Sequence, residues 1–434
     1  MAVTHRSISV APETTFGSLN ATTNLPSTSG LTFISIPCER DPIIIYGEPV
    51  ASERNDARDG SYGLPPEPDT VYSSGSRVRR RTGQVQIRLD LTTIGATPAN
   101  YDSNYLGYLL GAGFQTAKHT MTSDSPSAVA SVNSFTPTLA STQYATGALV
   151  GIEKNGIAEY SAVTDNDDSG DVSISPAFSA LTTSDTIRAL QTWYPGSRSQ
   201  TGNKVSSIAF EVNGVDFKSM CFGCVLESIS ISLDSGRVMA DMTFQSACIQ
   251  DDHASAVSPV EPSYNAGSPP FFRGSYVVVS TGSPTSLTNA SSTGDELART
   301  KLDCEDFTLT ITNTLTPLGH SDTILAMSEM EISDVDVELT LTLSSPTTAL
   351  NNDYFNRTLR QVLVGTGPIG DGKGCAFMLP AAYLTNDASA YDVSGNDIVR
   401  QTLTYKQSRF GGDVVADDQA ANAGNSPLRI ALGV

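Results

Sequence analysis

The sequence predicts a mainly β protein, a β-sandwich or barrel with one short helix in each of two similar halves. The first observation is compositional: charged residues make up only 17% of the 434 residues. Uncharged polar residues mixed with short runs of Val, Ile and Thr are typical of strands. The second is strict apolar–polar alternation in two stretches, 84–92 and 334–342. The third is that these stretches match when the chain is shifted by 250 positions.

The two alternating stretches predict half-buried antiparallel strands, because a period of two places one set of side chains on one face. The apolar sets are Val85, Ile87, Leu89 and Leu91 in the first stretch, and Val335, Val337, Leu339 and Leu341 in the second.

The match continues without a gap into a short capped helix after each strand. Asp102 and Ser103 can cap a helix that carries Tyr105 and Leu109. At the same offset, Asn352 and Asp353 can cap one that carries Phe355 and Leu359. We predict two copies of one fold; the alternative is two ordinary strand–helix pairs.

Further matches at shorter offsets set the domain organisation. Residues 207–210 resemble 374–377, residues 242–244 resemble 403–405, and each half has an earlier strand, at 42–46 or 307–312. The first domain is therefore 1–114 with 205–250, and the second is 271–434. Residues 251–270, rich in Pro, Ser and Ala, read as a linker.

Residues 115–204 interrupt the first domain and predict an inserted small β-module. Four short strands are expected in it, at 148–153, 156–164, 171–175 and 186–193. Because an insertion is tolerated where both its ends reach the surface, we expect this module to fold separately.

The net charge of −20 argues against stable binding of nucleic acid, although not against a wall past which DNA slides. The first ten residues lack an apolar signal core, and no run approaches the ~20 apolar residues that span a bilayer. We therefore expect a protein that is first soluble in a cytoplasm. Six Cys are too sparse for a disulfide framework.

Three local patterns resemble binding motifs without the context that their chemistry needs. Residues 365–370 spell a dinucleotide fingerprint, but in a predicted helix-to-strand turn. Cys221 and Cys224 lack two further zinc ligands, and the acidic run 165–171 lacks the Glu that ends a calcium loop. The four His lie in polar stretches, and no catalytic set emerges. No cofactor, metal or enzyme activity is expected.

One basic cluster stands out in this acidic chain. It consists of Arg77, Arg79, Arg80 and Arg81. The cluster is either a solvated turn or a contact with an acidic neighbouring subunit, which is the reading that we prefer.

Taken together, these features resemble the tail tube proteins of long-tailed (siphovirus-type) bacteriophages, and similar tubes in gene-transfer and secretion machines. The resemblance covers most of the chain. It rests on the start at 13–17, the strand at 83–93, the helix at 104–113, the strand pair at 222–244 and the ending at 376–380. The long insert departs from the family pattern, which leaves the role of that segment open.

The resemblance implies a structural virion protein in the phage tail, assembled in the cytoplasm of the host bacterium. Chains with a duplicated fold form trimeric rings that imitate hexamers, and the rings stack into a tube through which DNA leaves the head. The implied partners are other copies of the chain and the tape measure and tail-end proteins, with DNA passing without stable binding and no membrane. The polar stretches 47–82 and 313–330 would suit ring-to-ring contacts, and the tails 1–31 and 411–434 would order on assembly.

The polar faces of the two long strands are the candidate lumen surface, because their apolar faces must pack on the core. These candidates are Gln84, Gln86, Arg88 and Asp90 in the first half, and Asp334, Asp336 and Glu338 in the second. The acids could instead pair with the basic cluster across a subunit interface. The rival functions are a head decoration protein or receptor-binding adhesin, and an enzyme.

Overall fold

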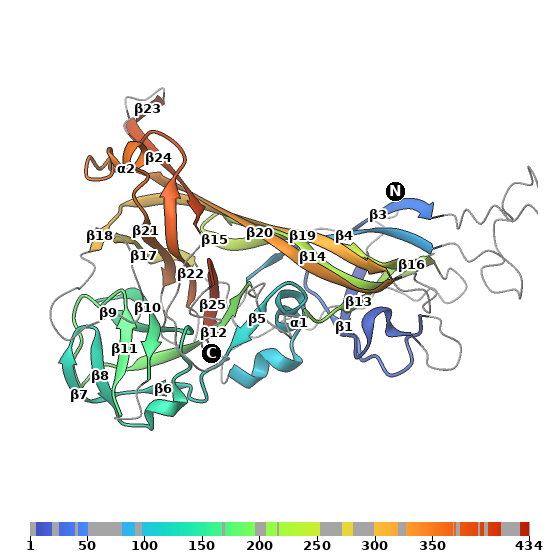
Figure 1. Cartoon of the computed structure of the whole chain (residues 1–434), viewed down its shortest axis with the longest axis horizontal. Helices are drawn as coiled ribbons and strands as arrows, with labels where there is room; N and C mark the ends of the chain where they lie inside the picture. Colours follow the sequence, from blue (N-terminus) through green and yellow to red (C-terminus); the bar gives the residue numbers. More distant parts are fainter. Residues whose placement is uncertain are drawn as a thin grey trace, which may run out of the picture.

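The computed structural model describes residues 6–19, 26–39, 42–50, 80–91, 98–166, 170–195, 205–214, 217–251, 271–280, 299–319, 327–367, 369, 374–388, 391–394, 398–408 and 426–433. Strands make up 62% of the structure and form one large antiparallel sheet, which confirms the mainly β class. Figure 1 shows an elongated molecule, with long strands running toward one end and a lobe of residues 115–195 beside the other.

The first half is built on the strand order β3–β4–β15–β14. The first part of β14 also pairs with β13 and β16, and β13 pairs with β1, which pairs with β2. The strands are β1 (Ser7–Pro12), β2 (Ile34–Ser35), β3 (Ile43–Val50), β4 (Arg80–Asp90), β13 (Ile208–Gly214), β14 (Phe217–Asp234), β15 (Arg237–Ser246) and β16 (Cys248–Asp251).

Helix α1 (Tyr105–Gly111) covers this half, after the 3-10 turns η1 (Phe16–Ser18) and η2 (Pro98–Ser103). Asn104 caps it, since its side chain accepts a hydrogen bond from the Leu106 N–H at 3.0 Å. The predicted caps, Asp102 and Ser103, are therefore wrong by one or two positions. Leu106, Leu109 and Leu110 are fully buried on the face of the helix that packs on the sheet.

Glu13 ties the N-terminal segment to this half. Its carboxylate accepts hydrogen bonds from the backbone N–H of Gly17 at 2.9 Å and of Gly223 at 3.0 Å, and from the Ser207 hydroxyl at 2.6 Å. Gly223 lies at a positive φ of 61°, a conformation that favours glycine. Burial raises the pKa of Glu13, and the hydrogen bonds oppose that rise.

The second half follows with nine strands and one short helix. They are β17 (Phe271–Ser280), β18 (Arg299–Lys301), β19 (Cys304–Gly319), β20 (Met327–Leu343), α2 (Asp353–Asn356), β21 (Arg360–Gly367), β22 (Cys375–Leu384), β23 (Tyr391–Ser394), β24 (Ile398–Gln407) and β25 (Arg429–Gly433). The long hairpin of β19 and β20 replaces the predicted polar stretch 313–330, because both strands continue well past the expected ends.

The two halves share one sheet, because β14 pairs directly with β19. From there the order is β19–β20–β24–β22–β21–β17, and β17 returns to β15 at Phe271 and Arg237. These strands close a circuit around apolar side chains, where Phe307 packs on Phe272 and Phe377 at centroid distances of 5.4 and 5.6 Å. Residues 252–270, most of the predicted linker, lie outside the described residues.

The alternating strands hold comparable positions in the two halves. Each lies between the strand before it and a later one: β4 between β3 and β15, and β20 between β19 and β24. Leu89 is opposite Ala240, whereas its counterpart Leu339 is opposite Tyr405. Tyr405 thus corresponds to Ala240 and not to Phe244, so the match of 242–244 with 403–405 is wrong by four residues.

Other predicted matches between the halves fail. Tyr105 is 2% exposed in α1, but Phe355 is 68% exposed and α2 ends before Leu359. The helix of the second half is too short to present an apolar face, so these two aromatic residues are not equivalent. Residues 207–210 and 374–377 also differ, because β13 lies between β1 and β14 whereas β22 lies beside β21, β24 and β25. Duplication of the whole fold stays a prediction.

The four strands expected in the insert are present within two residues of their predicted bounds. They are β9 (Leu149–Lys154), β10 (Ile157–Asp165), β11 (Val172–Ser175) and β12 (Ile187–Tyr194). The additional elements are β5 (Gln115–Ala117), β6 (Ser123–Asp124), β7 (Pro126–Ser131), β8 (Ser134–Pro137) and η3 (Ser141–Gln143).

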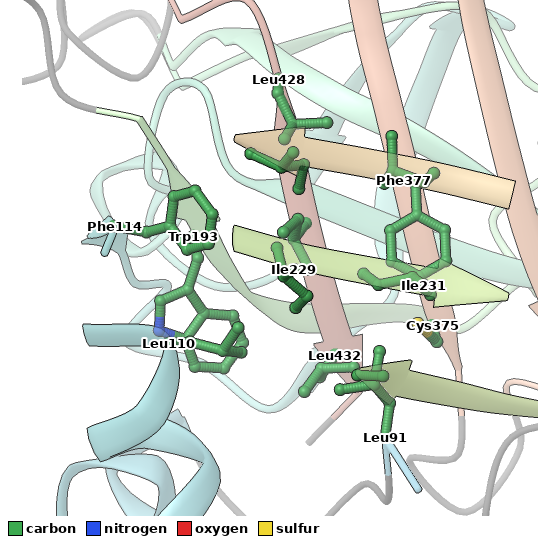
Figure 2. Packing of buried hydrophobic residues seen from close by; sticks show 14 of the residues in the cluster. Leu91, Leu110, Phe114, Trp193, Ile229, Ile231, Cys375, Phe377, Leu428 and Leu432 are labelled. Carbon is green, nitrogen blue, oxygen red and sulfur yellow. The ribbon is translucent and has the colours of Figure 1, made fainter. Parts of the chain in front are cut away.

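The insert is joined to the second half and does not pack as a separate module. Residues 190–193 of β12 pair with residues 430–433 of β25, which in turn pairs with β22. Figure 2 shows Trp193 of the insert, Ile229 of β14 and Leu432 of β25 in one apolar cluster. The C-terminal segment is therefore core, and the expectation that it orders only on assembly is wrong for β25. It is equally wrong for β1, which is largely buried against β13.

The buried ion pair between Arg360 and Asp353 supports α2. The guanidinium donates to both carboxylate oxygens, at 2.7 and 2.8 Å, and the two side chains are 11% and 5% exposed. We expect Asp353→Ala to lower the free energy of unfolding by about 3–5 kcal/mol, because it leaves a buried charge without its partner. Urea denaturation monitored by intrinsic fluorescence measures this loss.

Two variants sharpen this prediction. Asp336→Ala removes an exposed pair with Lys406 and should cost at most ~1 kcal/mol. The double variant Asp353→Ala/Arg360→Met should be more stable than Asp353→Ala alone, since it removes the stranded charge. A single variant as stable as wild type would contradict the structural role of the pair.

Candidate functional site

The candidate lumen residues of the two halves lie on one face of the same sheet. Directly opposed residues form continuous rows across β3, β4, β15, β14, β19 and β20. One row is Ile43, Gln86, Thr243, Ser228, Thr312 and Asp336. The next is Arg88, Asp241, Ser230, Thr310, Glu338 and, on β24, Lys406. We call this surface the polar face.

The opposite side of these strands is the core. The row between the two above consists of Ile87, Met242, Ile229, Ile311 and Val337, each at most 4% exposed. Because successive side chains of a strand point to opposite faces, burial of this row turns the polar face toward solvent. The predicted orientation of both strands is therefore confirmed.

Short hydroxyl side chains fill the middle of the polar face. Those in its rows on β14 and β19 are Ser228, Ser230, Ser232, Thr308, Thr310 and Thr312. Sequence reasoning did not assign them to the face. The alternation of Thr with Phe307, Leu309 and Ile311 was a usable signal, but nothing local indicated that β19 lies beside β14.

In the first half the polar-face cations Arg88 and Arg237 are both paired with carboxylates of the same chain. Arg88 lies 2.9 Å from Glu39, 2.7 Å from Asp234 and 3.7 Å from Asp241. Arg237 contacts Glu39 at 3.0 Å and Asp90 at 3.3 Å. Burial raises the pKa of Asp90, and the positive charge of Arg237 opposes that rise. This part of the face is therefore an ion-pair network in which four carboxylates surround two guanidinium groups.

The two glutamines of β4 on this face also lie beside residues of β14 and β15. The Gln84 amide donates to Glu227 at 2.7 Å, and Gln86 lies opposite Thr243. Gln84, Arg88 and Asp90 thus contact side chains of β14 or β15.

The second half of the polar face carries three carboxylates on one strand. Asp334, Asp336 and Glu338 are all exposed on β20. Lys406 donates to Asp336 at 2.9 Å, and that hydrogen bond raises the pKa of Lys406. Exposed carboxylates and hydroxyls form hydrogen bonds with water. Among the described residues of β20 and β24 that lie in these rows, Lys406 is the one cation that could attract a phosphate group.

The basic cluster is only partly within the described structure. Arg77 and Arg79 lie outside it, and Arg80 and Arg81 are described only as backbone, at the start of β4 opposite Val50 and Pro49. Its contact with a neighbouring subunit stays a prediction.

The three binding-like motifs have other roles in the fold. Residues 365–367 end β21 and β22 begins at Cys375, so the glycine-rich segment joins two strands and not, as predicted, a helix and a strand. Cys221 and Cys224 are buried thiols of β14, and burial raises the pKa of Cys224. The acidic run connects the antiparallel strands β10 and β11, as expected for a hairpin turn.

His119 differs from its prediction as a residue in a polar stretch. It is 2% exposed, with Nδ1 accepting from the Ala145 N–H at 3.0 Å and Nε2 3.0 Å from the Leu149 oxygen. Burial lowers its pKa to about 4, so it is neutral at physiological pH and serves the insert structurally. Within the described residues, no group of three or more His, Cys, Asp or Glu is arranged to hold a metal ion.

A pocket of about 210 Å³ lies between α1 and β12. Tyr101, Tyr108, Gln191 and Trp193 are among its lining residues. The Gln191 amide and the Trp193 indole N–H are buried without a hydrogen-bond partner in the described structure. Both residues line the pocket, and its volume is large enough for ordered water. The lining residues of this pocket do not form a recognisable catalytic set.

Comparison with models of known protein families and with curated proteins finds no match. In the described part of the chain, neither helix has the length and apolar character needed to cross a bilayer. The inference of function therefore depends on the polar face and the sheet that carries it.

Proposed function

We propose that this chain is a structural subunit of a phage tail tube, with the polar face forming the channel wall. The observation that carries the proposal is the continuity of that face: two polar rows, those of Gln86 and Arg88, run unbroken from β4 of the first half to β20 of the second. A wall past which a polyanion moves needs a wide, hydrated surface without unpaired cations. This face has hydroxyls in its middle and exposed carboxylates on β20, and its cations Arg88, Arg237 and Lys406 are each paired with a carboxylate.

The packing of the chain is consistent with a wall. The polar face is backed by a continuous apolar core, so one side of the sheet stays rigid while the other remains open to solvent. A surface rich in carboxylates repels DNA only within a screening length of ~8 Å at physiological salt, which keeps DNA off the wall without closing a wide channel.

We further propose that three copies form each ring and that rings stack into the tube, whose other partners are the tape measure and tail-end proteins of a phage particle. Two comparable strand arrangements per chain supply six wedges from three copies, which makes a trimer with pseudo-sixfold symmetry economical. The cytoplasm of the host is the proposed site of assembly, and the virion tail the final location.

Electron microscopy of the purified chain tests this function. Tubes of uniform diameter with an open centre, built from rings of three copies, are the expected result. A mass measurement that finds only a stable dimer, or rings of six full chains, would count against the trimeric arrangement. Discrete globular particles at every protein concentration would overturn the tube itself.

A further inference from the structure

The sheet that carries the polar face ends in two strand edges. On the side away from β4, β3 pairs with no described strand. On the side away from β19, β20 pairs with β24 only from Glu338 onward, and residues 327–337 pair with no described strand there. Just beyond β24, the Gln407 side chain donates a hydrogen bond to the Val335 carbonyl oxygen. Edge strands of this kind invite pairing with another chain.

The two edges lie at the same level of the sheet. Ile43, the first residue of β3, shares a row with Asp336 of β20. From that row, β3 continues to Val50 in the same direction in which β20 is followed back to Met327, so both stretches extend toward the same end of the sheet. The part of β20 that neither β24 nor the Gln407 side chain contacts thus begins at Asp334, and β3 spans the same height on the opposite edge.

The strand directions are also compatible. Neighbours alternate in direction through β3, β4, β15, β14, β19 and β20, since every pairing is antiparallel. Because this series contains an even number of strands, a second copy placed beside the first presents its β3 antiparallel to β20. The repeat continues the antiparallel sheet from chain to chain.

We propose that β3 of one copy pairs with residues 327–334 of β20 in the next copy. The contact is head-to-tail: each copy uses one edge as donor and the other as acceptor, so it generates rings or filaments rather than closed dimers. It gives the proposed tube its lateral contact and, in that respect, rests on the proposed function.

The proposed strand pairing can be tested by placing a negative or a positive side chain at one edge position. Ile43 and Ile45 lie on the polar face, opposite Gln86 and Gln84, and are 45% and 44% exposed. With the rows in line, Ile45 of one copy lies near Asp334 and Asp336 of the next. A carboxylate at position 45 would meet like charge, whereas an ammonium would meet opposite charge.

The experiment compares Ile45→Glu with Ile45→Lys, which change the same exposed position by opposite charges. We expect Ile45→Glu to raise the protein concentration needed for assembly about tenfold, and Ile45→Lys to leave it at or below the wild-type value. Leu139→Glu, on an exposed residue of the insert, is the matched control and should have no effect. Equal shifts for the two Ile45 variants would overturn the pairing.

A charge reversal identifies the partner strand. Ile45→Glu/Asp334→Lys should assemble at nearly the wild-type concentration. The rescue cannot act within one chain, because β3 and β20 are separated by four strands, or about 24 Å between strand axes. Failure of the double variant to assemble better than Ile45→Glu would overturn the assignment of β20.

A cross-linking experiment tests the strand pairing independently of the proposal that the chain forms a tube. When an Ile45→Cys chain is mixed with an Asp334→Cys chain under mild oxidation, the mixed disulfide dimer should exceed either homodimer. A statistical mixture of dimers overturns the strand pairing even if wild-type tubes form. A preferred mixed dimer without any tubes would instead retain the pairing and refute the tube.

Discussion

Deletion of residues 116–199, with a short Gly/Ser bridge, is expected to leave a chain that does not fold. The sequence predicted the opposite, because an insertion between core elements is tolerated when its ends reach the surface. In the structure β12 completes the sheet beside β25, with Leu190, Thr192 and Trp193 among its paired residues. Without β12, the paired edge of β25 and the apolar cluster around Trp193 are exposed to water.

A single substitution at Trp193 tests how much the contact of β12 with the core contributes to stability. It is 1% exposed and packs edge-on against Tyr101 at a centroid distance of 5.1 Å. Trp193→Ala should lower the free energy of unfolding by about 3–5 kcal/mol, through lost burial and the cavity left behind. Leu139→Ala, at an exposed site of the same lobe, should be near neutral.

Solubility, circular dichroism and limited proteolysis check the deletion, and urea denaturation checks the point variants. A soluble, cooperatively folding deletion protein would show that the insert is a separate module after all. A small effect of Trp193→Ala would mean that the β12–β25 edge contributes little to the core.

Replacement of Asp334 and Glu338 by Lys is expected to leave tubes intact and to slow or stall the passage of DNA. This prediction rests on the proposed function. Both acids are exposed on the polar face, on the side of the sheet opposite the core. Asp336 is left unchanged because it pairs with Lys406.

The expected slowing follows from counterion release. Each Lys that neutralises a phosphate creates an attraction whose strength falls steeply as salt rises. The rate of DNA release from assembled particles should therefore drop for the double variant at low salt and recover partly at high salt. The matched control is Glu153→Lys/Asp165→Lys, which makes the same change of charge at exposed positions of the insert.

Two results would contradict this reading. If the double variant fails to assemble while the control assembles, the acids form ion pairs across a subunit interface, as in the alternative pairing with the basic cluster. If DNA leaves both variants at the wild-type rate, the polar face does not line the channel.

The sequence by itself determined the mainly β class, the orientation of both long strands and four strands of the insert. These are local properties: alternation dictates which side chains share a face, and turn residues mark where short strands end. Val85, Ile87 and Leu89 were therefore placed on the buried side from their spacing alone, and the structure buries them. The same reasoning turned Asp334 and Asp336 to solvent.

Only the tertiary structure decided which strands are neighbours. β14 meets β19, and β12 meets β25, across chain separations that carry no local signal. The register of β24 against β20 differs from the sequence match because many Thr-rich segments fit the same alternation equally well. Phe355 failed as the counterpart of Tyr105 for a related reason: the helix that should present it ends at Asn356. Side-chain direction depends on the backbone next to it, whereas strand partnership depends on how the whole core closes.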